Sequence, residues 1–178
     1  MTDAIRFRRA TSADAEPLAR GVLDGVADYP AFAPDGWTGP SFEDELAHHR
    51  DDLTKEHVHC IVAERDGQLL GQITVVPAAL APHPVEDPEL GHVRNLFVAR
   101  GEWGSGLAGR LHAAVVEAAR GLGMTALRLY VAEGQARARR FYEREGWRAA
   151  GEPYHDPAPG LRMVEYRLPI RSVSPHKH

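Results

Sequence analysis

Apolar residues recur along the chain with two different spacings. One spacing is typical of strands and the other of helices, and together they divide the chain into short elements of both kinds. Residues 5–9 alternate apolar and polar side chains, the pattern of a half-buried strand. Thr11 to Asp14 resembles a capping box, and Ser41 to Asp44 is a second helix start signal. They predict helices that run to about residues 27 and 53. The segment between these helices, residues 29–40, is too rich in proline and glycine for regular structure, so we expect a loop there.

The rest of the chain predicts a hairpin followed by alternating strands and helices. Residues 57–65 and 68–76 are strand-like and meet at Asp66-Gly67, a dipeptide typical of tight hairpin turns. After a proline-rich connection we expect strand 90–99, helix 104–120, strand 125–131, helix 135–145, and closing strands 147–151 and 161–170. These elements predict a single domain over residues 1–170 and a C-terminal tail over residues 171–178.

Composition narrows the class of partner. The formal net charge of −4 argues against a nucleic-acid-binding surface or an anionic membrane as partner. A single cysteine, Cys60, rules out a disulfide within the chain, and the N-terminal residues lack the apolar core of a signal peptide. We therefore expect a cytoplasmic protein that acts on small molecules.

A glycine-rich turn between the strand 90–99 and the next helix is the strongest candidate for a binding site. Gly104-Ser-Gly106-Leu-Ala-Gly109 opens a helix whose first backbone N–H groups can hold a phosphate. The turn also satisfies the G-x-G-x-x-G pattern of dinucleotide-binding proteins, with Glu133 near the position of their ribose-binding acid. Residues 99–103 separate the turn from its strand, however, and this spacing argues against a dinucleotide-binding fold. No Gly-Lys-Ser/Thr follows the glycines, which argues against the phosphate-binding loop of an NTPase. A pyrophosphate held by main-chain amides, as in coenzyme A, fits this spacing better.

Two motifs in the second half of the chain resemble those of the GNAT superfamily of N-acetyltransferases. Leu96-x-Val98, five spacer residues, and Gly104-x-Gly106-Leu-Ala108-x-x-Leu111 are similar to its acetyl-CoA motif. About thirty residues later, the stretch from Gln135 to Trp147 with Ala138, Phe141 and Tyr142 is similar to its second signature. With a weaker N-terminal match, the resemblance covers roughly residues 4–170.

The resemblance implies an α/β (α+β) fold with a mixed, mostly antiparallel sheet. About six or seven strands are expected, splayed in the middle and flanked by about four helices. Acetyl-CoA is the implied cosubstrate, with no metal. The residues implied to bind it are Leu96, Phe97, Val98, Trp103, Gly104, Ser105, Gly106, Leu107, Ala108, Gly109, Gln135, Ala138 and Phe141.

Three positions depart from the family pattern. Trp103 stands where relatives usually have arginine or glutamine before the first glycine of the turn, and its side chain removes one possible polar contact to the pyrophosphate. Gln135 replaces the usual asparagine before the second helix, and Arg100 replaces a frequent proline after the strand.

Two residues are candidates for the chemistry. An aliphatic amine must lose a proton before it attacks a thioester, and the departing thiolate benefits from a proton donor. The resemblance implies that Tyr142 is this donor. His92 lies six residues before Val98, where many relatives have a glutamate, and this position implies that His92 is the base, directly or through water. A histidine at this position is equally typical of a structural residue that is hydrogen-bonded at the end of a sheet.

The expected reaction is direct transfer of an acetyl group to a primary amine of a small molecule or peptide in a ternary complex. A non-catalytic acyl-CoA-binding or sensor protein of the same fold is the alternative, and a dinucleotide-binding protein is a remote one. An excess of acidic residues between Asp24 and Asp52 could attract a cationic amine, but it is also typical of a solvated surface. We expect a monomer or homodimer.

Overall fold

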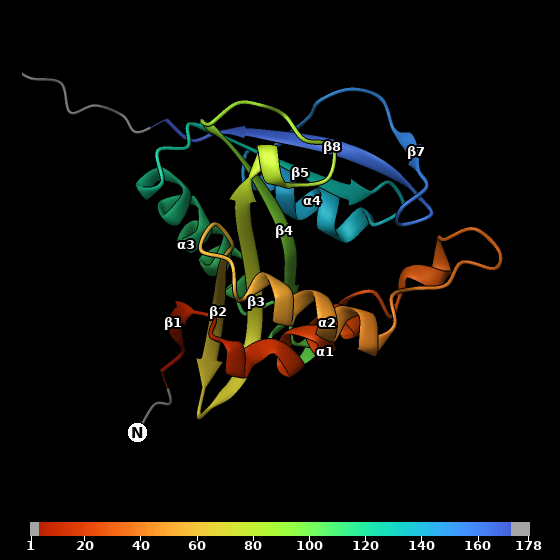
Figure 1. Ribbon diagram of the computed structural model, residues 1–178. Coiled ribbons are helices and arrows are strands. Elements are labelled where there is room, and N and C mark those ends of the chain that lie inside the picture. The colour runs from red at the N-terminus through yellow and green to blue at the C-terminus, as the bar shows by residue number, and fades with distance from the viewer. Residues whose placement is uncertain (1–3, 172–178) are drawn as a thin grey trace, which may run out of the picture.

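The computed structural model describes residues 4–171, and its frame is a mixed sheet of eight strands (Figure 1). The strands follow the order β1-β2-β3-β4-β5-β8-β6, and β7 pairs with β8. Within the described residues, β4 and β5 form the one parallel pair, so this is not the doubly wound parallel sheet that a dinucleotide-binding protein requires. The strands are β1 (Arg6–Arg9), β2 (His59–Arg65), β3 (Gln68–Pro77), β4 (Leu90–Val98), β5 (Ala126–Ala132), β6 (Arg148–Ala149), β7 (Tyr154–Asp156) and β8 (Leu161–Pro169).

Within residues 4–171, four α-helices cover the sheet. They are α1 (Ala15–Gly25), α2 (Phe42–Asp52), α3 (Leu107–Gly121) and α4 (Ala136–Arg144). Short 3-10 turns lie at Ser12–Asp14, Tyr29–Ala31, Ala78–Leu80 and Arg100–Glu102. No helix in residues 4–171 has both the length and the apolar composition needed to cross a membrane.

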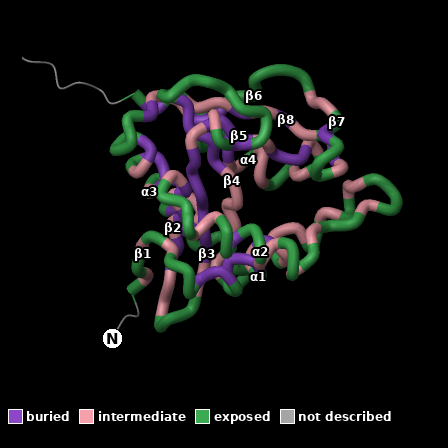
Figure 2. The backbone as a smooth tube through the Cα atoms, viewed as in Figure 1, coloured by how far each residue is buried: buried purple, intermediate pink, exposed green. Residues whose placement is uncertain are grey.

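Alternate side chains of the central strands face two different helical layers. Ile73 and Val75 of β3 pack with the apolar stripe of α3, which includes Leu111 and Val115, in the main core. Cys60 and Val62 of β2 pack against Leu18 of α1 instead. Because successive side chains of a strand point to opposite faces, α1 and α3 lie on opposite sides of the sheet. Figure 2 shows the buried positions concentrated along the central strands.

The predicted elements are confirmed, with differences at their ends. The helix expected from residue 104 begins at Leu107, because Gly104 and Gly106 both have positive φ and are not helical. The strand expected at 147–151 spans only Arg148–Ala149. Strand β7 was not expected, because the prolines around it indicate a loop. Apart from Arg171, the expected tail lies outside the described residues, and the division into domain and tail stays a prediction.

Candidate active site

Strands β4 and β5 separate partway along their length. Their ladder has three rungs and ends where His92 faces Arg128, although β4 continues to Val98 and β5 to Ala132. The divergence of the two strands is visible in Figure 1. Beyond His92, β4 has no ladder with β5 in the described part of the chain, so its main-chain groups on that side are open to a ligand.

A bulge in β4 lies next to this opening. On β3, only Ile73 separates the residues that pair with Arg94 and Phe97, whereas on β4 two residues, Asn95 and Leu96, occupy the same interval. Asn95 has a φ of 58°, in the left-handed region that few residues other than glycine adopt without cost. The bulge bends β4 where the split begins and changes the direction of the following peptide groups.

The glycine turn forms an open cradle at the C-terminal end of β4. Gly104 and Gly106 have φ of 81° and 87°, and a Cβ atom at either position would meet no atom within 4 Å. The Ser105 hydroxyl donates to the Glu102 carbonyl and accepts from the N–H of Leu107. Arg110 N–H is the first to bond back into α3, at the Gly106 carbonyl. Among the described residues, the N–H groups of Ala108 and Gly109 therefore remain for an anion at the positive end of the helix.

Trp103 links this turn to β4 and α4. Its indole N–H donates to the Val98 carbonyl at 3.0 Å, and the residue remains 43% exposed. The Arg137 guanidinium lies 3.6 Å from the centre of the indole and that of Arg100 lies 5.0 Å away, so the ring makes cation–π contacts with both. The Trp103 indole is thus bonded to the Val98 carbonyl, one of the main-chain groups that the sequence predicts to bind the cosubstrate.

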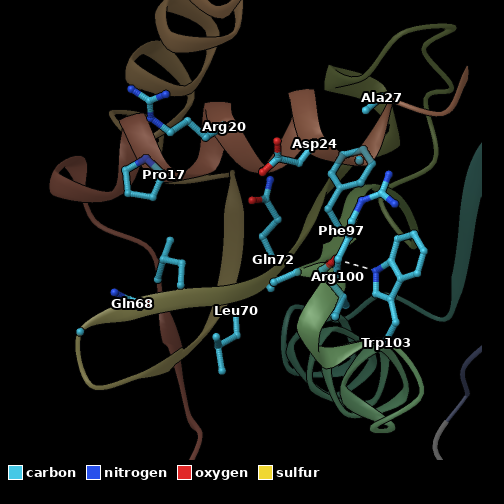
Figure 3. A pocket seen from close by; sticks show the side chains of 17 residues that line it. Pro17, Arg20, Asp24, Ala27, Gln68, Leu70, Gln72, Phe97, Arg100 and Trp103 are labelled. Carbon is cyan, nitrogen blue, oxygen red and sulfur yellow. Dashed lines mark hydrogen bonds between the residues drawn. The ribbon is translucent and has the colours of Figure 1, made fainter. Parts of the chain in front are cut away.

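A cavity of about 640 Å³ lies between α1, the β2–β3 hairpin and the end of β4 (Figure 3). Phe97 and Trp103 border it, but no residue of β5 or α4 does. Phe97 packs so closely on α1 that a Cβ at Gly25 would lie 1.9 Å from its ring. The side chain of Phe97 therefore supports α1, and only its main chain remains as a candidate for cosubstrate binding.

Tyr142 lies on α4 in an aromatic cluster. It is 9% exposed, and its ring contacts those of Phe141, Trp147 and Tyr166. Burial raises the pKa of its phenol, and the phenol of Tyr29 acts in the same direction. Tyr142 is therefore protonated at neutral pH, the state that a proton donor requires.

The remaining α4 positions form the wall of the core next to the glycine turn. Ala138 and Phe141 are partly buried against the main core, and Phe141 meets the ring of His112 on α3. Gln135 precedes α4 as its N-cap, and its side chain makes no capping hydrogen bond. The structure therefore brings the glycine turn and α4 together, while the binding role of each residue stays a prediction.

His92 is buried at the last rung of the β4–β5 ladder. It is 4% exposed, and its Nδ1 accepts a hydrogen bond of 3.2 Å from Nε of Arg128. Burial, followed by the charges on Arg128, Arg94 and His83, lowers the pKa of His92 to about 3. The imidazole is therefore neutral at pH 7. Its expected role as a proton acceptor stays a prediction.

Sequence reasoning missed Arg128, which is 1% exposed. The available signal was an arginine in the middle of the otherwise apolar run Ala126 to Ala132. A charged residue in such a strand is almost never buried without a special set of partners. Those partners come from β4 and from the proline-rich connection, so the sequence alone does not identify them.

An aromatic loop, residues 29–37, lies between α1 and α2 in the chain. The ring of Tyr29 contacts those of Phe32 and Trp37, and the Trp37 indole donates to the Pro159 carbonyl at 2.8 Å. Phe32 lies so near Gly134 that a Cβ there would be 2.6 Å from it. A second cavity of about 410 Å³ lies between residues 34–38 and residues 155–160. This loop, which the sequence assigned to the acceptor, thus reaches both the β5–α4 junction and the β7–β8 turn.

Part of the acidic charge between Asp24 and Asp52 is paired. Asp28 binds Arg100, Asp52 binds Arg94, and Asp51 binds Lys55. Within residues 4–171, no group of three or more His, Cys, Asp or Glu side chains is arranged to hold a metal ion. Both the attraction for a cationic amine and the absence of a metal stay predictions.

The chain is similar to known proteins in both sequence and fold. The sequence model of the acetyltransferase (GNAT) family matches residues 26–147, more than half of the chain. The chain belongs to the GNAT family. No curated protein matches this GNAT chain at a significant level.

Solved structures confirm the fold of this GNAT protein. A protein described as a GNAT-family acetyltransferase, from Desulfovibrio desulfuricans, shares 24% identity with a TM-score of 0.73, over 94% of this chain and 100% of that one. A protein from Salmonella typhimurium assigned as an acetyltransferase, solved with its cofactor acetyl-CoA, shares 16% identity over 98% and 99% of the two chains, with a TM-score of 0.70. A ribosomal-protein-alanine N-acetyltransferase from Brucella melitensis shares 20% identity over 92% and 99%, with a TM-score of 0.68.

Proposed function

We propose that this GNAT-family protein is an N-acetyltransferase that moves an acetyl group from acetyl-CoA to a primary amine of a small molecule or peptide. The observation that carries the proposal is the open segment of β4 beside an unobstructed glycine cradle. An extended chain of amide groups can pair with a strand whose edge is open, and a diphosphate can bind the N-terminus of a helix. Acetyl-CoA carries both groups in one molecule.

In this proposal, different groups of the chain bind different parts of acetyl-CoA. Main-chain groups of Leu96, Phe97 and Val98 pair with the pantetheine arm, and the amides from Gly104 to Gly109 bind the pyrophosphate. The Trp103 indole leaves the Val98 carbonyl when the pantetheine arm binds. Gln135, Ala138 and Phe141 form the adjoining wall on α4.

The transfer itself needs two proton movements. The amine nitrogen forms a bond to the thioester carbonyl carbon, the carbon–sulfur bond breaks, and Tyr142 donates a proton to the departing thiolate. The attacking nitrogen loses one proton, to His92 or to a chain of water molecules, and this proton finally restores the Tyr142 phenol. The products are an amide and free CoA.

A non-catalytic acyl-CoA-binding protein remains the second candidate. The burial of His92 favours it, because a pKa of about 3 makes the imidazole a poor base for the attacking amine. The neighbouring protein from Brucella is named for the alanine of a ribosomal protein, and another fold neighbour is named for phosphinothricin. Both acceptor types therefore belong in the test. Cytoplasmic location and a monomeric or dimeric state stay predictions.

The deciding experiment measures release of CoA from acetyl-CoA while a panel of amines is added one at a time. The panel contains amino acids, polyamines and peptides with different N-termini. An acetyltransferase releases CoA and forms an equal amount of amide only when a suitable amine is present. Binding of acetyl-CoA by calorimetry without amine-dependent release would favour the second candidate, and absence of binding would contradict both.

A further inference from the structure

Arg128 is a buried cation whose hydrogen-bond partners are all neutral. Its Nε donates to His92, and its two terminal nitrogens donate to the carbonyls of His83 and Pro82 at 2.7 and 2.9 Å. The guanidinium also lies 5.1 Å from the centre of the Tyr130 ring. Burying a charge is costly unless its donors are satisfied, and here three acceptors satisfy it without a carboxylate.

The direction of the Arg128–His92 hydrogen bond fixes the protonation state of His92. A guanidinium stays protonated in proteins and has no acceptor, so Arg128 is always the donor in this contact. Nδ1 of His92 therefore keeps its lone pair, and the neutral ring carries its proton on Nε2. Protonation of Nδ1 would break the bond and place two cations in contact.

The charged groups around His92 reinforce this state. Arg128 on β5, Arg94 on β4 and His83 on the connection between β3 and β4 all disfavour the imidazolium, as burial does. Tyr130 on β5 contributes an aromatic ring 5.6 Å from the imidazole. His83 is itself paired with Asp156 at 2.9 Å, so this carboxylate is already engaged.

The position of this pair in the sheet gives it significance for the reaction. His92 and Arg128 face each other on the last rung before β4 and β5 separate, so their side-chain bond closes the narrow end of the split. We propose that Arg128 is a positioning residue that holds His92 as a neutral imidazole protonated on Nε2, so that His92 acts as a hydrogen-bond donor and not as the base. The catalytic consequence rests on the proposed function, whereas the tautomer does not.

This role decides between the two proton routes. Nδ1 is occupied by Arg128 and Nε2 already holds a proton, so neither nitrogen can take a proton from the amine. The amine proton then leaves through water, and His92 orients an oxygen, either of that water or of the thioester carbonyl. The rate should therefore show no ionisation of His92 near neutral pH.

The tautomer is tested by nitrogen-15 NMR of the histidine rings in the full chain, with the His92 signals assigned by comparison with His92→Gln. We expect Nε2 protonated and Nδ1 unprotonated in the wild type, with no titration between pH 5.5 and 8. In Arg128→Met, Nδ1 is released, and the pKa should rise by at least one unit toward its ordinary value of about 6.5, with both tautomers populated. The control is Arg94→Met, which removes a nearby charge without removing a bond to His92, and it should keep the wild-type tautomer.

A wild-type His92 that titrates near neutral pH, or that carries its proton on Nδ1, overturns the proposal. The wild-type spectrum alone decides this, so the result stands even if Arg128→Met does not fold. An Arg128→Met spectrum identical to the wild type would also overturn it, because another group would then fix the ring.

The pH dependence of kcat in His92 variants distinguishes a hydrogen-bond donor from a base. His92→Ala should lower kcat about tenfold by the same factor at every pH from 6 to 9, and His92→Gln, which keeps a donor, should recover part of the loss. A loss concentrated near neutral pH would identify a base and contradict the donor role. If no amine is acetylated by any variant, the proposed function fails while the NMR result remains valid.

Discussion

At the scale of single residues, the site depends on buried polar side chains that are held in one protonation state. Tyr142 is kept protonated by burial among aromatic rings, and His92 is kept neutral by burial and by Arg128. His112 is a third example, because its Nε2 accepts the Trp147 indole N–H at 2.8 Å and burial lowers its pKa. These states follow from desolvation and from the direction of individual hydrogen bonds.

Removal of the Tyr142 hydroxyl tests the proton donor. In Tyr142→Phe we expect kcat to fall about 100-fold, at the low end of what a general acid contributes. The dissociation constant for acetyl-CoA should stay within about twofold, because the ring and its packing remain. The two quantities are measured by CoA release and by calorimetry.

The matched control for this substitution is Tyr166→Phe. The Tyr166 ring lies 6.5 Å from that of Tyr142, and its hydroxyl bonds to Arg139 and Glu143. We expect Tyr166→Phe to cost about 1–2 kcal/mol of stability with little change in kcat. Equal turnover in Tyr142→Phe and the wild type would remove Tyr142 from the mechanism.

At the scale of elements, β4 is the strand around which the site is built. Its first three residues pair with β5, its bulge contains Asn95, and its last residues lead into the glycine turn and α3. Its residue Phe97 packs against α1, and its edge toward β5 is unpaired beyond His92 within the described residues. The geometry of this strand therefore controls both halves of the site.

Substitution of Asn95 tests the bulge. Asn95→Gly should be as stable as the wild type within about 0.5 kcal/mol, because glycine adopts positive φ freely. Asn95→Val should lose roughly 1–2 kcal/mol, because a β-branched residue is strained in the left-handed region.

The same two Asn95 variants also test binding of the cosubstrate. Asn95→Val relieves its strain by straightening β4, so we expect its affinity for acetyl-CoA to fall about tenfold, or about 1.4 kcal/mol, while Asn95→Gly keeps wild-type affinity. Urea unfolding and calorimetry measure the two effects. Equal stability and equal affinity in both variants would show that the bulge is not required.

At the scale of the whole molecule, the fold keeps several histidines neutral in its interior. His49, His92 and His112 are each at most 5% exposed, and burial is the largest cause of their lowered pKa values. A histidine whose pKa is lower in the folded state stabilises the fold above the unfolded pKa of about 6.5, and this contribution is lost as the pH falls.

The free energy of unfolding should therefore fall between pH 7 and pH 5. In that interval the unfolded chain binds protons that the folded chain excludes, and His92 alone should account for about 1–2 kcal/mol. The raised pKa of Glu45 acts in the opposite direction near pH 5, so the net slope is smaller than the sum over the histidines. Urea titrations at pH 7 and pH 5 measure the free energy of unfolding. In His92→Gln this free energy should change less between the two pH values. A stability that is constant over this range would contradict the prediction.

Much of the fold could be predicted because local patterns dominate it. The alternation in β2 and β3 with Asp66-Gly67 between them specifies a hairpin, and the apolar stripe of α3 specifies a helix on a sheet. The β7 strand could not be predicted, because its three residues gain their stability from pairing with β8 and not from their own sequence. The same reason explains why β6 is shorter than expected.

The sequence by itself determined the order of the elements, the glycine turn that opens α3 and the family signatures, because these depend on neighbouring residues and on fixed spacing. Only the tertiary structure decided where β4 and β5 separate and which residue faces His92 there. Arg128 is 36 residues away along the chain, and its hydrogen bond determines which imidazole nitrogen carries the proton. Burial and contacts between distant strands set protonation states, and neither is encoded in a local pattern.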